Sequence, residues 1–205
     1  MNIYPITILL LLALFPFVSC QQGVKETETE LKSQVNMSMG IFKTYLNIGK
    51  TLHFDTTQQT YHFEADTSNT LRYLSMPIEG DFLLEVKLET HSTEGDYGFL
   101  LTADDKGEQP IATLQIMNSK VVFGPAGLVN ESFGHKIDVE SLRLERIGSK
   151  LTAYYCSPGR KFKPLAAQQL PIGTTIHGGL FAKNIKEAVV FSNMNLSKPE
   201  TTTLN

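Results

Sequence analysis

Tryptophan is absent from this chain of 205 residues, and cysteine is nearly so. Without Trp, the chain lacks the side chain that most often stacks on sugar rings and the best partner for a cation over an aromatic face. The two cysteines are Cys20 and Cys156, and Cys20 ends a short apolar segment of the export-signal type. Cys156 therefore has no partner in the remaining chain, which excludes a disulfide framework within one molecule.

The sequence also lacks an excess of basic residues and lacks long apolar runs. The chain has 18 Lys and Arg residues and 21 Asp and Glu residues, which gives a net charge of −3. It therefore has no excess of basic residues for binding nucleic acid, and no acidic tail. The apolar run at residues 6–15 is shorter than the roughly 20 residues that a membrane span needs. The remaining length is sufficient for one domain with a sizeable hydrophobic core. Such a domain needs no bound metal or disulfide bond to fold.

The end of the apolar run carries the first positive signal. Ser19 and Cys20, a small residue followed by cysteine, resemble the lipobox of bacterial lipoproteins, whose cysteine is acylated after the signal is cleaved. Phe17 stands where Leu is usual, and an ordinary secretory signal is the alternative interpretation. The resemblance implies an exported protein anchored to a membrane through acylated Cys20. Gln21, rather than Asp, after the cysteine favours the outer membrane, on either its periplasmic or its surface face.

Composition divides the chain into four parts. We expect a lipoprotein signal peptide at residues 1–19, a polar tether at 20–40, a folded domain at 41–198 and a disordered tail at 199–205.

Period-two alternation between turn residues dominates the domain. Residues 82–89 place four apolar side chains on one face and Glu85, Lys87 and Glu89 on the other. This pattern predicts an antiparallel strand with one buried and one solvated face. Further strands are expected at residues 61–65, 97–102, 111–117, 178–182 and 188–196.

A hairpin is the clearest local prediction. Residues 142–145 and 151–155 alternate, and Gly148-Ser149 between them suits a type II′ turn because Gly holds the first central position. Ser157-Pro158-Gly159-Arg160 has Pro and Gly where a type II turn requires them. Many short strands with frequent turns, and no amphipathic helix of useful length, predict an all-β fold, an antiparallel β-sandwich.

Five short motifs, in this order, carry a family resemblance: Gly80-Asp81-Phe82, Tyr97-Gly98-Phe99-Leu100-Leu101, Leu142-Arg143-Leu144-Glu145-Arg146, Gly178-Gly179-Leu180-Phe181-Ala182 and Val190-Phe191-Ser192-Asn193-Met194. They resemble the concanavalin A-like lectin/glucanase jelly-roll domains of the DUF1349 type. They are especially similar to the N-terminal domain of TolB-like periplasmic proteins of Bacteroidetes. The resemblance covers residues 47–196 and implies a concanavalin A-like jelly roll. The TolB-like propeller is not part of this sequence, so its roles do not carry over.

Catalytic motifs are weak. Glucanases on this fold carry Glu-x-Asp-x-x-Glu, with a nucleophile and an acid/base about 5–5.5 Å apart. Glu85 to Glu89 is the nearest match, but it lacks the Asp and places Lys87 between the carboxylates. An ion-paired outer face explains this pattern better, so we expect no catalytic residue and no enzyme activity.

Metal and cofactor signals are equally sparse. His53 and His62 could face each other across a hairpin, but zinc needs three or four converging ligands, so we expect an exposed pair without metal. Residues 104–108 (DDKGE) look like a cation loop but lack the EF-hand spacing, and a solvated turn is the better interpretation. No cofactor is expected. Concanavalin-like domains often carry structural calcium, which no motif here indicates.

Sugar binding requires an exposed aromatic ring flanked by side chains that bond hydroxyls. The candidate ligand-binding residues are Tyr73, Tyr97, Arg146, Tyr154 and Asn184, whereas Tyr155 is expected to point inward. Tyr is also a favoured strand residue, so a structural role is the alternative for each tyrosine.

Taken together, these observations predict a binding or accessory module of the cell envelope that is anchored by lipid, binds a polysaccharide and is not catalytic. Two alternatives stay open. One is a glycoside hydrolase-like enzyme on the same fold, and the other is a protein-interaction module that binds no small ligand.

Overall fold

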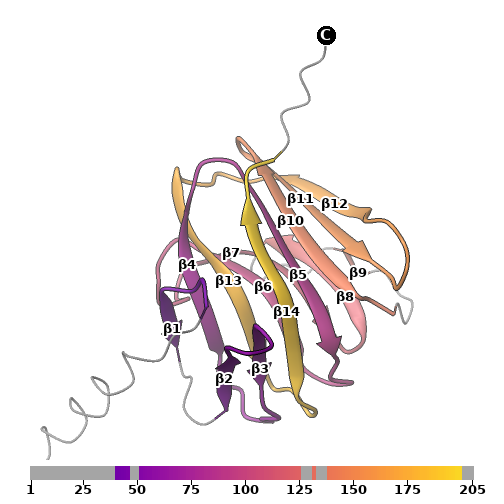
Figure 1. Ribbon diagram of the computed structural model, residues 1–205. Helices are drawn as coiled ribbons and strands as arrows, with labels where there is room; N and C mark the ends of the chain where they lie inside the picture. The colour runs from indigo at the N-terminus through magenta and orange to yellow at the C-terminus, as the bar shows by residue number, and fades with distance from the viewer. Residues whose placement is uncertain (1–39, 47–50, 126–130, 133–137, 200–205) are drawn as a thin grey trace, which may run out of the picture. The chain divides into compact units, whose positions relative to one another are not determined.

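The computed structural model describes residues 40–46, 51–125, 131–132 and 138–199, which all belong to one compact unit, residues 38–205 (Figure 1). The signal peptide, Cys20, almost all of the tether and the tail after residue 199 lie outside the described residues, so those predictions remain predictions. No helix in the described part of the chain is long and apolar enough to cross a membrane.

The described strands form two seven-stranded antiparallel sheets. Sheet A has the order β1-β4-β13-β6-β7-β8-β9. Its strands are β1 (Thr44–Leu46), β4 (Arg72–Glu79), β13 (Thr175–Lys183), β6 (Asp96–Thr102), β7 (Pro110–Met117), β8 (Lys120–Pro125) and β9 (Glu131–Ser132).

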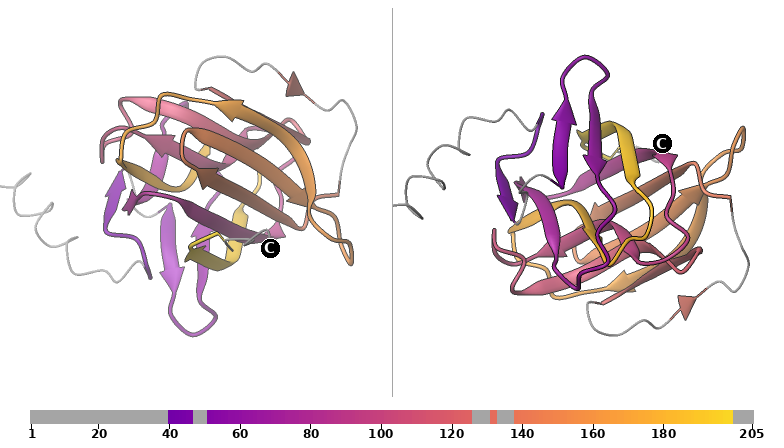
Figure 2. Two further views of the ribbon diagram at one scale, coloured as in Figure 1. Left: turned by 90° about the horizontal axis from the view of Figure 1, so that it is seen from above. Right: turned by 90° about the horizontal axis from the view of Figure 1, so that it is seen from below.

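Sheet B has the order β12-β11-β10-β5-β14-β3-β2. Its strands are β12 (Lys163–Gln169), β11 (Lys150–Cys156), β10 (Ser141–Ile147), β5 (Phe82–Thr90), β14 (Val189–Ser197), β3 (Thr60–Phe63) and β2 (Leu52–Asp55). Figure 2 shows the sandwich of the two sheets from above and from below. The predicted antiparallel β-sandwich is therefore confirmed.

The core lies between the sheets and follows from side-chain alternation. In β5, the alternate apolar residues Phe82, Leu84, Val86 and Leu88 are buried, while Glu85 and Lys87 are half-buried on the outer face. β10 and β11 alternate in the same way, and a contiguous apolar cluster fills the space between the sheets. Burial of this cluster supplies the main driving force for the fold.

The predicted turns are present. Gly148 has a φ of 61° and joins β10 to β11, as a type II′ turn requires. Arg160 N donates to Ser157 O at 2.9 Å, and Gly159 between them has a φ of 66°, as in a type II turn.

Strand β4 was not predicted, because five successive residues from Arg72 to Met76 are buried and no alternation is visible. A second apolar cluster, made of Tyr73, Leu100 and Phe181, covers the outer side of β4 and its neighbours in sheet A. Pro77 lies beyond the end of the short β1 and pairs with His177 of β13.

Candidate functional site

A cavity of about 360 Å³ opens at one end of the sandwich. Three connections enclose it: the loop between β5 and β6, the turn between β7 and β8, and the segment before β10. Its lining residues are His91, Ser92, Thr93, Tyr97, Ile116, Ser119, Lys120, Val121, Asp138 and Val139. We call it the end pocket.

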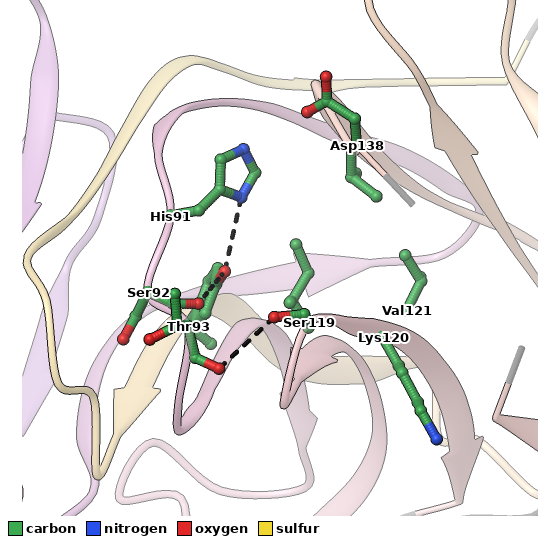
Figure 3. Close-up of a pocket in the computed structure, with 10 residues that line it drawn as sticks. His91, Ser92, Thr93, Ser119, Lys120, Val121 and Asp138 are labelled. Atoms are coloured by element: carbon green, nitrogen blue, oxygen red, sulfur yellow. Dashed lines mark hydrogen bonds between the residues drawn. The ribbon is translucent and has the colours of Figure 1, made fainter. Parts of the chain in front are cut away.

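The end pocket has an apolar floor and a polar rim. Tyr97, Ile116, Val121 and Val139 are buried members of the core and form the floor. The described rim consists of His91, Thr93, Ser119, Lys120 and Asp138. Figure 3 shows that Lys120 directs its amine away from the other labelled side chains, so its stem, more than its charge, faces the cavity.

Tyr97 and His91 link the floor to the rim. The Tyr97 hydroxyl donates to Ser92 O at 3.0 Å and lies 3.5 Å from His91 Nδ1 (Figure 3). Burial raises the pKa of Tyr97 to about 12, so the phenol stays protonated at neutral pH. Burial also lowers the pKa of His91, against the opposing effect of the Asp138 carboxylate, so a neutral imidazole is favoured at neutral pH.

The loop between β5 and β6 is held in place by Glu187. Its carboxylate accepts hydrogen bonds from Thr93 N at 2.8 Å and from the Ser92 hydroxyl at 2.8 Å. A Cβ at Gly95 would overlap Asn184 O, so only glycine permits this close approach to the connection between β13 and β14. One wall of the end pocket is therefore fixed before any ligand arrives.

The opposite wall is a two-residue turn. Asn118 and Ser119 have φ values of 49° and 62°, the left-handed pair that a type I′ hairpin turn uses. The Ser119 hydroxyl donates to Thr93 O at 3.5 Å and so connects the two walls.

Chemically, the end pocket suits a small polar ligand with an apolar face. Hydroxyl groups of such a ligand could bond to the serine, threonine, imidazole and carboxylate groups of the rim, while its carbon face rests on the floor. Asp138 is the one carboxylate in the described lining, whereas glycoside hydrolysis normally uses two.

A second cluster of polar and aromatic side chains lies on the outer face of sheet B. We call it the β10 face; it comprises Glu85, Arg143, Glu145, Tyr154 and Phe162. Arg143 donates to Glu85 Oε2 from Nε at 2.9 Å and from Nη2 at 2.7 Å. The Arg143 guanidinium carbon lies 3.8 Å from the centre of the Phe162 ring, and the Tyr154 hydroxyl donates to Glu145 Oε2 at 2.7 Å.

The carboxylates of the weak glucanase-like motif are both bonded to neighbours. Glu85 pairs with Arg143, while Glu89 accepts from Lys87 Nζ at 3.1 Å and from the Ser192 hydroxyl at 2.6 Å. The ion-paired outer face expected for these residues is confirmed.

Three of the candidate sugar-binding residues lack the exposure on which their selection depended. The side chains of Tyr73, Tyr97 and Arg146 are 0 %, 1 % and 5 % exposed. Tyr73 lies under the loop between β6 and β7, where a Cβ on Gly107 would be 3.3 Å from its ring, so it presents no face to a ligand. Tyr97 reaches the end pocket, but as part of its floor.

Arg146 is buried, and the alternation of its strand already indicated this. It shares the alternation of Leu142 and Leu144, so its side chain points inward, where Nε donates to Gly148 O at 2.9 Å. Arg143 is the outward arginine of the same strand. Tyr155 packs partly against the core, as expected.

The last two candidates, Tyr154 and Asn184, lie at the surface but are not among the residues that line the end pocket. Tyr154 is half-buried in the β10 face. Asn184 is exposed in the connection between β13 and β14, with a φ of 54°.

The histidine pair lies where the pattern placed it. His53 pairs with His62 across β2 and β3, and their rings stack with centres 4.5 Å apart and planes 12° from parallel. The 104–108 segment is a turn in which Asp104 Oδ1 accepts from Lys106 N and Glu108 N, both at 3.0 Å. Among the described residues, no three His, Cys, Asp or Glu side chains converge as metal ligands.

Sequence reasoning missed most of the end pocket, because its rim comes from connections rather than strands. His91, Thr93 and Asp138 show no periodicity, and nothing in the sequence brings residue 138 beside residue 91. Phe162 was missed as well, although an aromatic residue between Lys161 and Lys163 after a turn was a visible signal.

Comparisons with known proteins reveal similarity in structure. No family model matches the sequence, and no curated protein matches it. The carbohydrate-binding module CBM66 from Bacillus subtilis aligns with a TM-score of 0.55 at 15 % identity, over 78 % of this chain and 99 % of the module.

Two further structures show how widely the fold is shared. A functionally unknown protein from Saccharomyces cerevisiae has a TM-score of 0.55 at 17 % identity, over 76 % of this chain and 96 % of that one. An alginate lyase from Corynebacterium sp. has a TM-score of 0.52 at 7 % identity, covering 75 % and 83 %. At these identities the similarity shows the fold alone, a jelly-roll β-sandwich.

Proposed function

We propose that this protein is a non-catalytic carbohydrate-binding module, presented in the cell envelope on a lipid anchor. The observation that carries the binding proposal is the end pocket, with its apolar floor, its rim of hydroxyl, imidazole and carboxylate groups, and its volume of about 360 Å³. A sugar ring has one apolar face and a periphery of hydroxyls, so it matches both halves of this pocket.

The structural comparison supports the same class of ligand. The module CBM66, which spans nearly the same length of fold, is by its name a carbohydrate-binding protein. Fold alone does not determine function, so this similarity adds to the argument from the pocket and does not replace it.

The arrangement of carboxylates supports binding without hydrolysis. Glu85 and Glu89 are bonded to Arg143, Lys87 and Ser192, and the described lining of the end pocket offers Asp138 alone. A glycosidase would need a second carboxyl group across the scissile bond.

Export and anchoring are proposed from the sequence. Ser19 and Cys20 resemble a lipobox, and multiple acyl chains on Cys20 would hold the protein on a bilayer, where one chain would be marginal. The outer membrane and membership of the DUF1349 type belong to the same proposal.

Glycan binding is the first test. The full-length chain, purified in detergent, is titrated with neutral polysaccharides (a β-glucan, a xylan, a mannan and a levan) and acidic ones (alginate and polygalacturonate), and release of reducing sugar is assayed in parallel. Asp138→Ala should weaken binding about tenfold by removing a charged acceptor from the rim. Asp105→Ala, in an exposed loop outside the pocket lining, is the matched control and should bind like the parent protein.

The outcomes separate the alternatives. Binding without release, weakened by Asp138→Ala but not by Asp105→Ala, supports the proposal. Release of sugar would overturn the non-catalytic assignment, and the absence of both binding and release would overturn the carbohydrate assignment and favour a protein partner.

Anchoring has its own test. Cys20→Ser should move the protein from the membrane fraction to the soluble fraction of cells and abolish incorporation of a labelled fatty acid. Unchanged membrane association and labelling would contradict the lipid anchor.

A further inference from the structure

The β10 face holds aromatic and charged side chains in a row across three strands of sheet B. Glu85 on β5, Arg143 on β10 and Tyr154 on β11 are direct cross-strand neighbours. With strands about 4.8 Å apart, the row extends roughly 10 Å across the sheet. Glu145, two residues along β10, receives the hydrogen bond of the Tyr154 hydroxyl.

Phe162 is placed over this row, away from the protein interior. It is half-buried, and it belongs to neither of the two apolar clusters of the described residues. The ring contacts the Arg143 guanidinium at 3.8 Å, which fixes the ring from one side. An aromatic ring set on a charged face contributes little to a core, so core packing does not explain its position.

The ion pair beneath the ring is oriented in advance. Arg143 and Glu85 are 29 % and 30 % exposed, and exposed pairs contribute little to stability. Both donated bonds go to Oε2 of Glu85, so Oε1 of that carboxylate makes no hydrogen bond to another described residue. A fixed planar guanidinium, a fixed carboxylate and a fixed ring provide a donor, an acceptor and a stacking surface without further loss of side-chain freedom.

The charges of this face indicate which ligand it suits. Within the β10 face, the Glu85 carboxylate already bonds the Arg143 guanidinium, and the Glu145 carboxylate already accepts from the Tyr154 hydroxyl. Two exposed lysines, Lys161 and Lys163, flank Phe162 in the sequence. The Arg143 cation is thus compensated by Glu85 and is not a free partner for a ligand carboxylate, whereas neutral hydroxyls can share the existing donors and acceptors.

We propose that the β10 face is a second saccharide-contacting surface, in which one neutral sugar unit stacks on the side of Phe162 that faces away from Arg143 and the adjoining unit bonds to the Glu85 carboxylate and to Tyr154. This inference rests on the proposed carbohydrate-binding function but uses residues separate from the end pocket. It implies a preference for neutral over acidic polysaccharides.

The test uses the same full-length chain and the same panel of neutral and acidic polysaccharides. Phe162→Ala should weaken binding of the neutral polysaccharide about threefold to tenfold, the size expected for one aromatic contact. Phe162→Tyr should retain binding, because it keeps the ring. Ile147→Ala, which removes a 54 % exposed apolar side chain at the end of β10, is the matched control and should change nothing.

Thermal unfolding of each variant checks that the fold is intact, which we expect because Phe162 lies outside the core clusters. If the parent protein binds a neutral polysaccharide and Phe162→Ala binds it equally well, the proposed second surface is overturned. The end pocket is tested separately, by Asp138→Ala. A preference for alginate or polygalacturonate would also overturn it. Absence of all binding would remove the proposed function itself.

Discussion

At the scale of single residues, Arg72 is the most constrained charge in the described domain. Its side chain is 1 % exposed, and Nη1 donates to Glu64 O at 2.6 Å and to Thr51 O at 3.1 Å. Burial lowers its pKa, and the Phe63 ring lies 5.8 Å away. Arg72 therefore ties the start of β4 in sheet A to the β2–β3 hairpin of sheet B.

Replacement of Arg72 should lower the free energy of unfolding substantially. Arg72→Ala leaves the Glu64 and Thr51 carbonyls without this donor and opens a cavity, so we expect a loss of about 3–5 kcal/mol in the free energy of unfolding. Arg72→Met keeps most of the volume and should lose less, about 1–3 kcal/mol. Urea denaturation of both variants gives the comparison, and equal losses would contradict the separate contribution of packing.

Gly179 is constrained by space. A Cβ at this position would overlap Leu74 O on the neighbouring strand β4 and lie 2.9 Å from Ser75 Cα, and neither atom belongs to a flexible side chain. Gly179→Ala should therefore destabilise the protein by about 2–4 kcal/mol through backbone displacement. At Gly173 the nearest atom to an added Cβ is 3.6 Å away, so Gly173→Ala should change stability by less than about 1 kcal/mol. Similar melting temperatures for the two variants would refute this prediction.

At the scale of elements, the β2–β3 hairpin carries a pH-dependent contact. The pKa of His62 is lowered, first by burial and then by the stacked His53, against weaker opposing effects of Asp55 and Glu64. Because the folded state disfavours the proton, this histidine contributes its stability above its unfolded pKa of about 6.5. That contribution is lost as the pH falls through the lowered folded value.

We therefore expect stability to decrease between about pH 7 and about pH 5, and His62→Gln to reduce the slope of that decrease. Urea midpoints at several pH values in this range provide the measurement. His91, whose pKa burial also lowers, should account for part of the remaining slope. An unchanged slope in His62→Gln would show that the stacked pair does not contribute.

The buried face could be predicted for strands with one solvent-exposed face, but not for strands covered on both faces. The alternation in residues 82–89 and the glycine at 148 gave β5 and the β10–β11 hairpin, because local periodicity and turn chemistry decide both. β4 and β6 have consecutive buried residues, so their inward and outward side chains cannot be distinguished by period. For that reason the sequence did not show that Tyr73 and Tyr97 are buried.

At the scale of the whole molecule, the sandwich should be stable without the segment that precedes it. The described residues belong to a compact unit that starts at Ser38, and its apolar cluster draws on both sheets. A chain that begins at Ser38 should unfold in one cooperative transition, with a melting temperature within about 2 °C of the full-length protein. Circular dichroism during heating tests this, and a broad or much lower transition would contradict it.

The sequence by itself determined the all-β class, the antiparallel sandwich, the main turns and the ion-paired outer face, because these depend on alternation, glycine, proline and charge at short range. Tertiary structure alone decided the end pocket and the β10 face. Their residues come from connections and strands far apart in the chain, such as His91 and Asp138, or Glu85 and Arg143. Packing of the two sheets sets which of these side chains meet, and which tyrosines are covered.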